Sequence, residues 1–234
     1  MTSTAATLAQ VRSSLATGRA VVLPNPAPLT HVITATGPRA VNEAKGRPPG
    51  LPVALWAHHP GTLRALDPLW DLTPRCRTLA RWLLAEEHLT VLLPLRPRAT
   101  CPAWLAPAQK DGWILLFGAR WDPLRPVLDA HPLLYVSSAN RTRRPPAATT
   151  AEALAMFPAT VPVLAPPPAA GPDTPREAVP RQATTTVRLH PDGRLLLHRD
   201  GAQNRPYPRP EDYLARLRAR AGGRDTGRPG PRRT

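Results

Sequence analysis

The sequence predicts an α/β fold in which helices cover a mixed β-sheet. Segments with helical spacing and short apolar segments typical of strands alternate along most of the 234 residues. Hydrophobic residues make up 42% of the chain, enough to bury a core in a domain of this length. Near the carboxyl end, His190-Pro191-Asp192-Gly193 is typical of a tight turn between antiparallel strands.

The amino-terminal half begins with a helix expected at 5–16, where apolar residues recur at helical spacing until Thr17-Gly18. Short apolar runs predict strands, and a longer amphipathic stretch predicts a second helix. These further elements are strands at 20–23 and 53–56, a helix at 75–86 and a strand at 89–93. Glu86-Glu87 is expected to form the exposed end of that helix.

The carboxyl-terminal half continues the alternation. Thr149 and Glu152 have the spacing of a capping box, which predicts a helix that extends to about Met156. The other elements expected in this half are a strand at 113–117, a short helix near 122–129, and strands at 133–136, 184–189 and 194–198.

The net charge of +15 is concentrated toward the carboxyl end. We expect one domain at 1–203 and a Pro- and Arg-rich tail at 204–234, disordered from about residue 217 because apolar residues are almost absent there. Two interpretations of this tail stay open. It either binds RNA or another polyanion with salt-dependent affinity, or it only keeps the protein in solution.

The two cysteines, Cys76 and Cys101, form neither a metal-binding pattern nor a disulfide framework. We therefore expect a cytoplasmic protein without a tightly bound metal. No apolar run approaches the roughly 18 residues of a membrane-spanning helix. The amino terminus also lacks the pattern of a signal peptide, so no membrane partner is expected.

A first candidate site is the loop that contains Lys45 and Arg47. Only two of the 31 basic residues are lysines, and in so arginine-rich a chain a lysine that is kept indicates a need for a compact ammonium group. Gly46 places no side chain between the two cations. Both can therefore face one anion, such as a phosphate or a carboxylate.

Two further segments carry polar side chains suited to ligand binding. Ser137-Ser138-Ala139-Asn140 directly follows the strand expected at 133–136, at the end of a strand where α/β sheets bind ligands. Thr184 and Arg199 lie at the start and end of the expected terminal hairpin. The arginines that follow Asn140 suit phosphate or RNA: Arg141, Arg143 and Arg144.

Five segments follow one another along the chain: Lys45-Gly46-Arg47-Pro48, His88-Leu89-Thr90-Val91-Leu92-Leu93-Pro94, Ser138-Ala139-Asn140 followed by Pro145, Pro146, Thr149 and Thr150, then Thr184-Thr185-Thr186-Val187 and Arg199-Asp200-Gly201-Ala202. In this order and spacing they resemble the YrdC-like domain, the fold of threonylcarbamoyl-AMP synthases. The resemblance covers about residues 5–203. Arg120 follows a strand at roughly the place of another family arginine.

This resemblance implies a twisted sheet around a deep, positively charged cavity. It also implies a reaction in which ATP, bicarbonate and L-threonine give threonylcarbamoyl-AMP and pyrophosphate, for the N6-threonylcarbamoyl modification of tRNA adenosine. Mg²⁺ would arrive with ATP. The implied binding residues are Lys45 and Arg47 for carboxylate and phosphate oxygens, Ser138 and Asn140 on the nucleotide and carbamate side, Thr184 and Arg199 closing the cavity, with Thr90 and Arg120 as further candidates.

One segment departs from the family pattern Pro-Thr-x-Thr-x-Tyr-Gly. Here the sequence is Pro24-Asn25-Pro26-Ala27-Pro28-Leu29-Thr30-His31, so the amino-acid half of the pocket is altered while the anion-binding half is kept. Three functions therefore stay open. They are a threonylcarbamoyl-AMP synthase, a paralogue with carbamoyl-adenylate chemistry on another amine, and a non-catalytic module that binds tRNA or double-stranded RNA.

Overall fold

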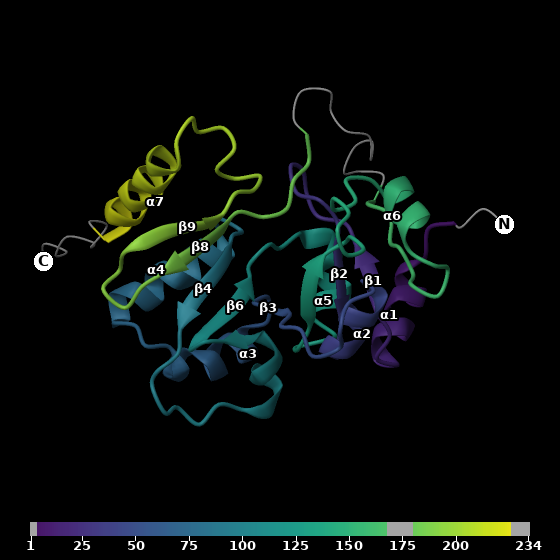
Figure 1. Ribbon diagram of the computed structural model, residues 1–234, viewed down its shortest axis with the longest axis horizontal. Coiled ribbons are helices and arrows are strands. Elements are labelled where there is room, and N and C mark those ends of the chain that lie inside the picture. Colours follow the sequence, from purple (N-terminus) through teal and green to yellow (C-terminus); the bar gives the residue numbers. More distant parts are fainter. Residues whose placement is uncertain (1–3, 168–179, 226–234) are drawn as a thin grey trace, which may run out of the picture.

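The computed structural model describes residues 4–167 and 180–225, which form one nine-stranded sheet with helices packed against it (Figure 1). The strand order is β1-β2-β7-β3-β6-β4-β8-β9, and β5 pairs with β6. The strands are β1 (Val21–Leu23), β2 (Val32–Ala35), β3 (Ala54–Trp56), β4 (Thr90–Pro94), β5 (Gln109–Lys110), β6 (Trp113–Phe117), β7 (Tyr135–Ser138), β8 (Thr186–Leu189) and β9 (Leu195–Arg199).

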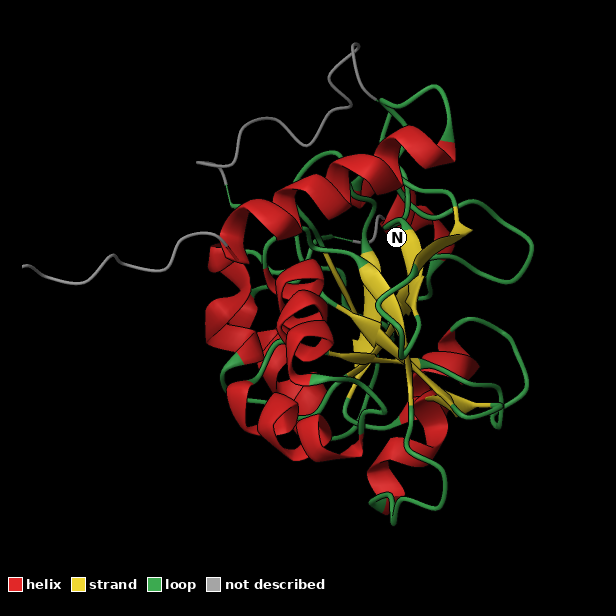
Figure 2. Ribbon diagram, turned by 90° about the vertical axis from the view of Figure 1, so that its left-hand side faces the viewer, coloured by secondary structure: helices red, strands yellow, loops and turns green. Residues whose placement is uncertain are grey.

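The sheet is mixed, because β3 pairs with β6 and β4 with β8 in parallel while the other pairs are antiparallel. Most of the helices lie on one side of it (Figure 2). The α/β fold with covering helices is confirmed. The helices are α1 (Leu8–Ala16), α2 (Pro38–Ala44), α3 (Pro60–Leu66), α4 (Pro74–Ala85), α5 (Arg125–Leu128), α6 (Thr150–Met156) and α7 (Pro210–Asp225), with 3-10 turns η1 (Asp67–Leu69), η2 (Ala103–Ala108) and η3 (Asp122–Leu124).

Alternating side chains of the strands supply two apolar clusters, one on each face of the sheet. Val22, Ile33 and Leu116 belong to the larger cluster, whereas Val21 and Phe117 belong to the smaller one. The period of two along the strands therefore sets which residues each face buries. Within residues 4–167 and 180–225, no helix is both long and apolar enough to cross a membrane.

The carboxyl-terminal segment corrects one expectation. Residues 217–225 are not disordered, because they belong to α7, and Leu217 is completely buried. Tyr213 and Leu214 pack into the same core, so one apolar stripe holds an otherwise polar helix against the sheet. Residues 226–234 lie outside the described part of the chain.

The end of α4 corrects a second expectation. Glu86 is exposed, as expected, but only 6% of the Glu87 side chain is accessible to solvent. Its carboxylate forms ion pairs with Arg216 (2.8 Å) and Arg220 on α7. Figure 1 shows α4 and α7 at the end of the sheet that contains β8 and β9.

Candidate anion-binding cavity

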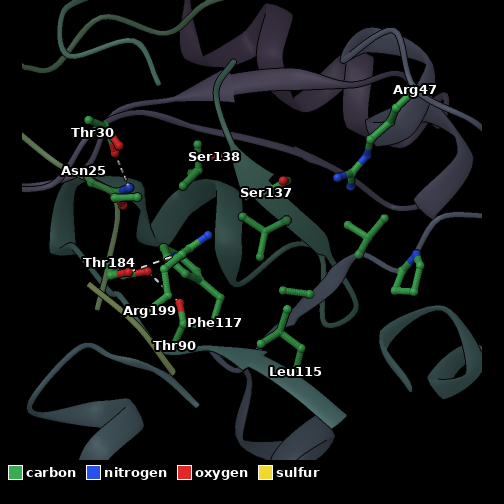
Figure 3. A pocket seen from close by; sticks show the side chains of 16 residues that line it. Asn25, Thr30, Arg47, Thr90, Leu115, Phe117, Ser137, Ser138, Thr184 and Arg199 are labelled. Carbon is green, nitrogen blue, oxygen red and sulfur yellow. Dashed lines mark hydrogen bonds between the residues drawn. The ribbon is translucent and has the colours of Figure 1, made fainter. Parts of the chain in front are cut away.

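A cavity of about 190 Å³ opens on the sheet face that carries Leu115 and Phe117 (Figure 3). Strands β3, β6 and β7 supply an apolar wall, with Ala54, Leu115 and Val136 among its residues. The polar lining comes from the ends of strands, from the 24–31 segment and from the loop that carries Arg47. It consists of Asn25, Thr30, Arg47, Thr90, Ser137, Ser138, Thr184 and Arg199.

Strand register brings Thr90 and Thr184 together, although 94 residues separate them. Thr90 opposes Phe117 on β6 and Thr186 on β8, so the segment just before β8 lies beside the start of β4. The hydroxyl oxygens of Thr90 and Thr184 are 2.6 Å apart and share a hydrogen bond. Arg199, at the end of β9, donates to the Thr184 carbonyl oxygen at 3.4 Å.

Gly201 allows the chain after Arg199 to fold back against the start of β8. A Cβ atom there would lie 2.3 Å from the Thr185 backbone nitrogen, closer than real contacts permit. The Asn204 Oδ1 atom accepts hydrogen bonds from the Thr185 hydroxyl and the Gly201 amide, both at 2.8 Å. The Arg-x-Gly-Ala segment thus fixes the backbone that carries Arg199 to the cavity.

Lys45 lies behind the cavity wall rather than among its lining residues. The side chain is buried, and its Nζ atom donates to the Ser138 carbonyl oxygen and, at 2.7 Å, to the Asn140 Oδ1 atom. Burial, with added repulsion from Arg47 and Arg199, lowers the pKa of Lys45 to about 7. Its ammonium group therefore joins the Lys-x-Arg loop to the Ser-Ala-Asn loop.

Arg47 reaches the cavity from the other side of that loop. Its Nε atom donates to the Asn42 Oδ1 atom, and the Asn42 amide donates to the Pro49 and Leu51 carbonyl oxygens at 2.7 and 2.8 Å. This support fixes the guanidinium group. One of its terminal nitrogens, Nη2, is buried without a hydrogen-bond partner in the described part of the chain.

The altered 24–31 segment forms another side of the cavity. Asn25 and Thr30 line it, and the Asn25 Nδ2 atom donates to the Thr30 carbonyl oxygen at 2.9 Å. Arg181 donates to the Asn25 and Leu29 carbonyl oxygens, both at 3.1 Å. Ala27, at the position where the resembled pattern has its second threonine, is exposed and is not among the lining residues.

The predicted site residues thus fall into four groups. Arg47, Thr90, Ser138, Thr184 and Arg199 line one cavity, while Lys45 and Asn140 support its Ser-Ala-Asn loop. Arg120 does not line the cavity, and its guanidinium group donates to the Ala57 carbonyl oxygen at 2.9 Å. The exposed arginines after the loop are Arg141, Arg143 and Arg144.

Of the eight polar lining residues, sequence reasoning assigned five to the site and left three unassigned. Ser137 belongs to the segment singled out after the predicted strand, but only Ser138 and Asn140 of that segment were assigned to binding. Asn25 and Thr30 lie in the segment identified as divergent, and strand pairing gave no sign that both would face the cavity. No Asp or Glu occurs among the lining residues that the structure describes, so its charged groups are cationic. Within 4–167 and 180–225 no His, Cys, Asp and Glu cluster suits a metal ion.

Comparisons with known proteins find likeness at the level of structure. No protein-family model matches the sequence, and no curated protein matches it. A Sua5 variant from P. abyssi aligns with TM-score 0.60 and 17% identity over 82% of this chain and 55% of Sua5. HypF aligns with TM-score 0.59 and 16% identity over 84% of this chain and 29% of HypF.

YciO from E. coli is closer in length to this chain. It aligns with TM-score 0.56 and 14% identity over 82% of this chain and 87% of YciO. The chain therefore spans about half of Sua5 and less than a third of HypF, but it corresponds to most of YciO. At these identities the likeness shows a shared fold.

Proposed function

Because the chain has the YrdC-like fold, we propose that it is a nucleotidyltransferase that makes threonylcarbamoyl-AMP from ATP, bicarbonate and L-threonine, for tRNA modification. The observation that carries this proposal is the cavity, where Arg47 and Arg199 lie among hydroxyl groups and no carboxylate lines the described wall. Sua5 from P. abyssi was solved with L-threonine, and HypF in a phosphate- and nucleotide-bound form. Proteins of this fold therefore bind both ligand classes.

The proposed chemistry needs charge neutralisation and alignment more than proton transfer. The threonine amine attacks the carbon of bicarbonate, and loss of water leaves an N-carboxylate. An oxygen of that carbamate then attacks the α-phosphorus of ATP, and the bond to pyrophosphate breaks. Both reactants of the second step are anions, so fixed guanidinium groups lower the barrier by offsetting their repulsion.

The size of the cavity suits the smaller reactant. Sites for drug-sized ligands usually enclose about 300–1,000 Å³, compared with about 190 Å³ here. We place the threonine carbamate inside and the nucleoside of ATP at the mouth, near the exposed side chain of Arg199. Mg²⁺ would enter on the ATP phosphates, where it would neutralise their charge.

A second candidate function uses the same cavity with another amine. It is favoured by the 24–31 segment, where Asn25 lines the cavity while Ala27 and Leu29 do not. In this function the carbamate of a different amine would attack ATP in the same way.

The test is pyrophosphate release from ATP and bicarbonate, with and without L-threonine. We expect threonine-dependent release that Arg47→Ala reduces about 100-fold, as for loss of a donor to a developing charge. Arg64→Ala, which removes an exposed arginine on α3 outside the cavity, is the matched control and should retain full release. If ATP binds but only another amine supports release, the second function replaces the first.

A further inference from the structure

Two residues that line the cavity each carry a buried polar atom without a hydrogen-bond partner in the described part of the chain. One is a donor, the Nη2 atom of Arg47, and the other is an acceptor, the Oδ1 atom of Asn25. Figure 3 shows these two side chains on opposite sides of the cavity. Buried polar groups in folded proteins nearly always have partners, so a ligand is expected to offer an acceptor at one side and a donor at the other.

The orientation of the Asn25 amide is fixed by its neighbours. Its Nδ2 atom donates to the Thr30 carbonyl oxygen at 2.9 Å, and a carbonyl oxygen can only accept. The side chain is 2% exposed, and Arg181 holds the backbone of the same residue through the Asn25 carbonyl oxygen. The Oδ1 atom is therefore the end of the amide that remains for a ligand.

The other polar lining groups have different requirements. The guanidinium groups of Arg47 and Arg199 only donate. The Ser138 hydroxyl already donates to the Asn140 Oδ1 atom at 2.7 Å, and the Thr90 and Thr184 hydroxyls bond to each other. The hydroxyls of Thr30 and Ser137 can donate or accept. Among the polar side chains that line the cavity, the Asn25 amide oxygen is the group that can only accept. It marks the place of an N–H or O–H group of the ligand.

We propose that the Asn25 Oδ1 atom accepts a hydrogen bond from the amine nitrogen of the substrate, so that this residue selects amine-bearing carboxylates over carboxylates without an amine. The inference rests on the proposed function in one respect, because it takes the ligand to be the amino acid that becomes carboxylated. The carboxylate meets Arg47, and the nitrogen, which keeps one N–H as a carbamate, faces Asn25.

A binding cycle tests this contact without turnover. L-Threonine and 3-hydroxybutanoate, which differ by the amine alone, are titrated by calorimetry into the full chain in bicarbonate buffer without ATP. We expect the wild type to bind threonine about tenfold more tightly, the effect of one hydrogen bond to a buried acceptor. Asn25→Ala should bind both ligands equally, and the control Arg64→Ala should behave as the wild type.

A second variant separates the contact from a structural role. Asn25→Asp loses the donor to Thr30 but keeps an acceptor of the same shape, so it should keep the preference for threonine, and thermal unfolding reports whether each variant folds. A preference that survives in Asn25→Ala, or disappears in Asn25→Asp, would overturn the inference. So would the absence of threonine binding in the wild type. Binding without pyrophosphate release would instead overturn only the proposed function.

Discussion

At the scale of single residues, Lys45 shows how one buried cation links two loops. Its ammonium group bonds to the Ser138 carbonyl oxygen and to Asn140, and both belong to the loop on the opposite side of the cavity wall. An arginine fork could not replace a compact ammonium in this space without displacing the loop. The cost is electrostatic, because burial and the nearby charges of Arg47 and Arg199 oppose protonation.

Because burial lowers the pKa of Lys45, we expect the free energy of unfolding to rise with pH. The pKa of Lys45 is about 7 in the folded chain and near 10.4 when unfolded, so between these values the unfolded state binds more protons. Stability from this group therefore increases as pH rises through that window. From pH 7 to pH 9 we expect a gain of about 2 kcal/mol in the free energy of unfolding.

Urea denaturation of the wild type and of Lys45→Met at both pH values measures this gain. The variant has no ammonium at this position, so it should lack the increase whatever its absolute stability. An equal pH dependence in the two proteins would show that Lys45 keeps an ordinary pKa in the folded chain.

At the scale of elements, the local sequence predicted the helices whose ends are determined by capping residues and apolar spacing. Capping residues and apolar spacing placed α1, α4 and α6 within about three residues of their observed ends. The same criteria missed β2, α2 and α3, each of four to seven residues, because so short a segment barely establishes a period. Helix α7 was missed for another reason.

Interactions between residues distant in sequence stabilise α7. Residues 217–225 are rich in Arg and Gly, which locally favours disorder, but Glu87 lies 129 residues from its partner Arg216. Burial of Tyr213, Leu214 and Leu217 adds apolar packing. Most helical stability in proteins comes from such packing rather than from propensity, and local composition does not reveal it.

Removing the arginines that pair with Glu87 should lower the free energy of unfolding more than removing the charge of Glu87 itself. Arg216→Ala with Arg220→Ala would leave a buried carboxylate unpaired, so we expect a loss of about 3 kcal/mol in the free energy of unfolding. Glu87→Gln removes that charge and leaves two arginines whose side chains are 32% and 52% exposed. Its loss should be smaller, about 1 kcal/mol.

Chemical denaturation at one pH compares the variants. Arg209→Ala is the matched control, because it breaks an exposed ion pair with Asp212 at the start of the same helix and should cost no more than about 0.5 kcal/mol. A larger loss for Glu87→Gln than for the double arginine variant would contradict this account of the buried carboxylate.

At the scale of the whole molecule, the sheet assembles the cavity from segments spread between residues 25 and 199. Motif resemblance predicted five of the lining residues, because the order of the motifs carries information that each short motif lacks. It could not predict the acceptor role of Asn25, which depends on how the amide is held by Thr30. The resemblance also could not show that Lys45 lies behind the cavity wall whereas Arg47 lines the cavity.

Deletion of residues 226–234 tests, at the scale of the whole molecule, whether the protein acts by catalysis or by RNA binding. Residues 226–234 contain three arginines and no acidic residue, and they follow α7, whereas a cut at 217 would remove part of that helix. If the cavity carries the function, deletion of 226–234 should leave threonine-dependent pyrophosphate release within about twofold of the full chain. We expect only non-specific RNA affinity to fall, because the shortened chain neutralises fewer phosphates. Both activities are measured in parallel at two salt concentrations. If neither protein releases pyrophosphate and the shortened chain binds RNA more weakly, the result would instead support a non-catalytic RNA-binding module.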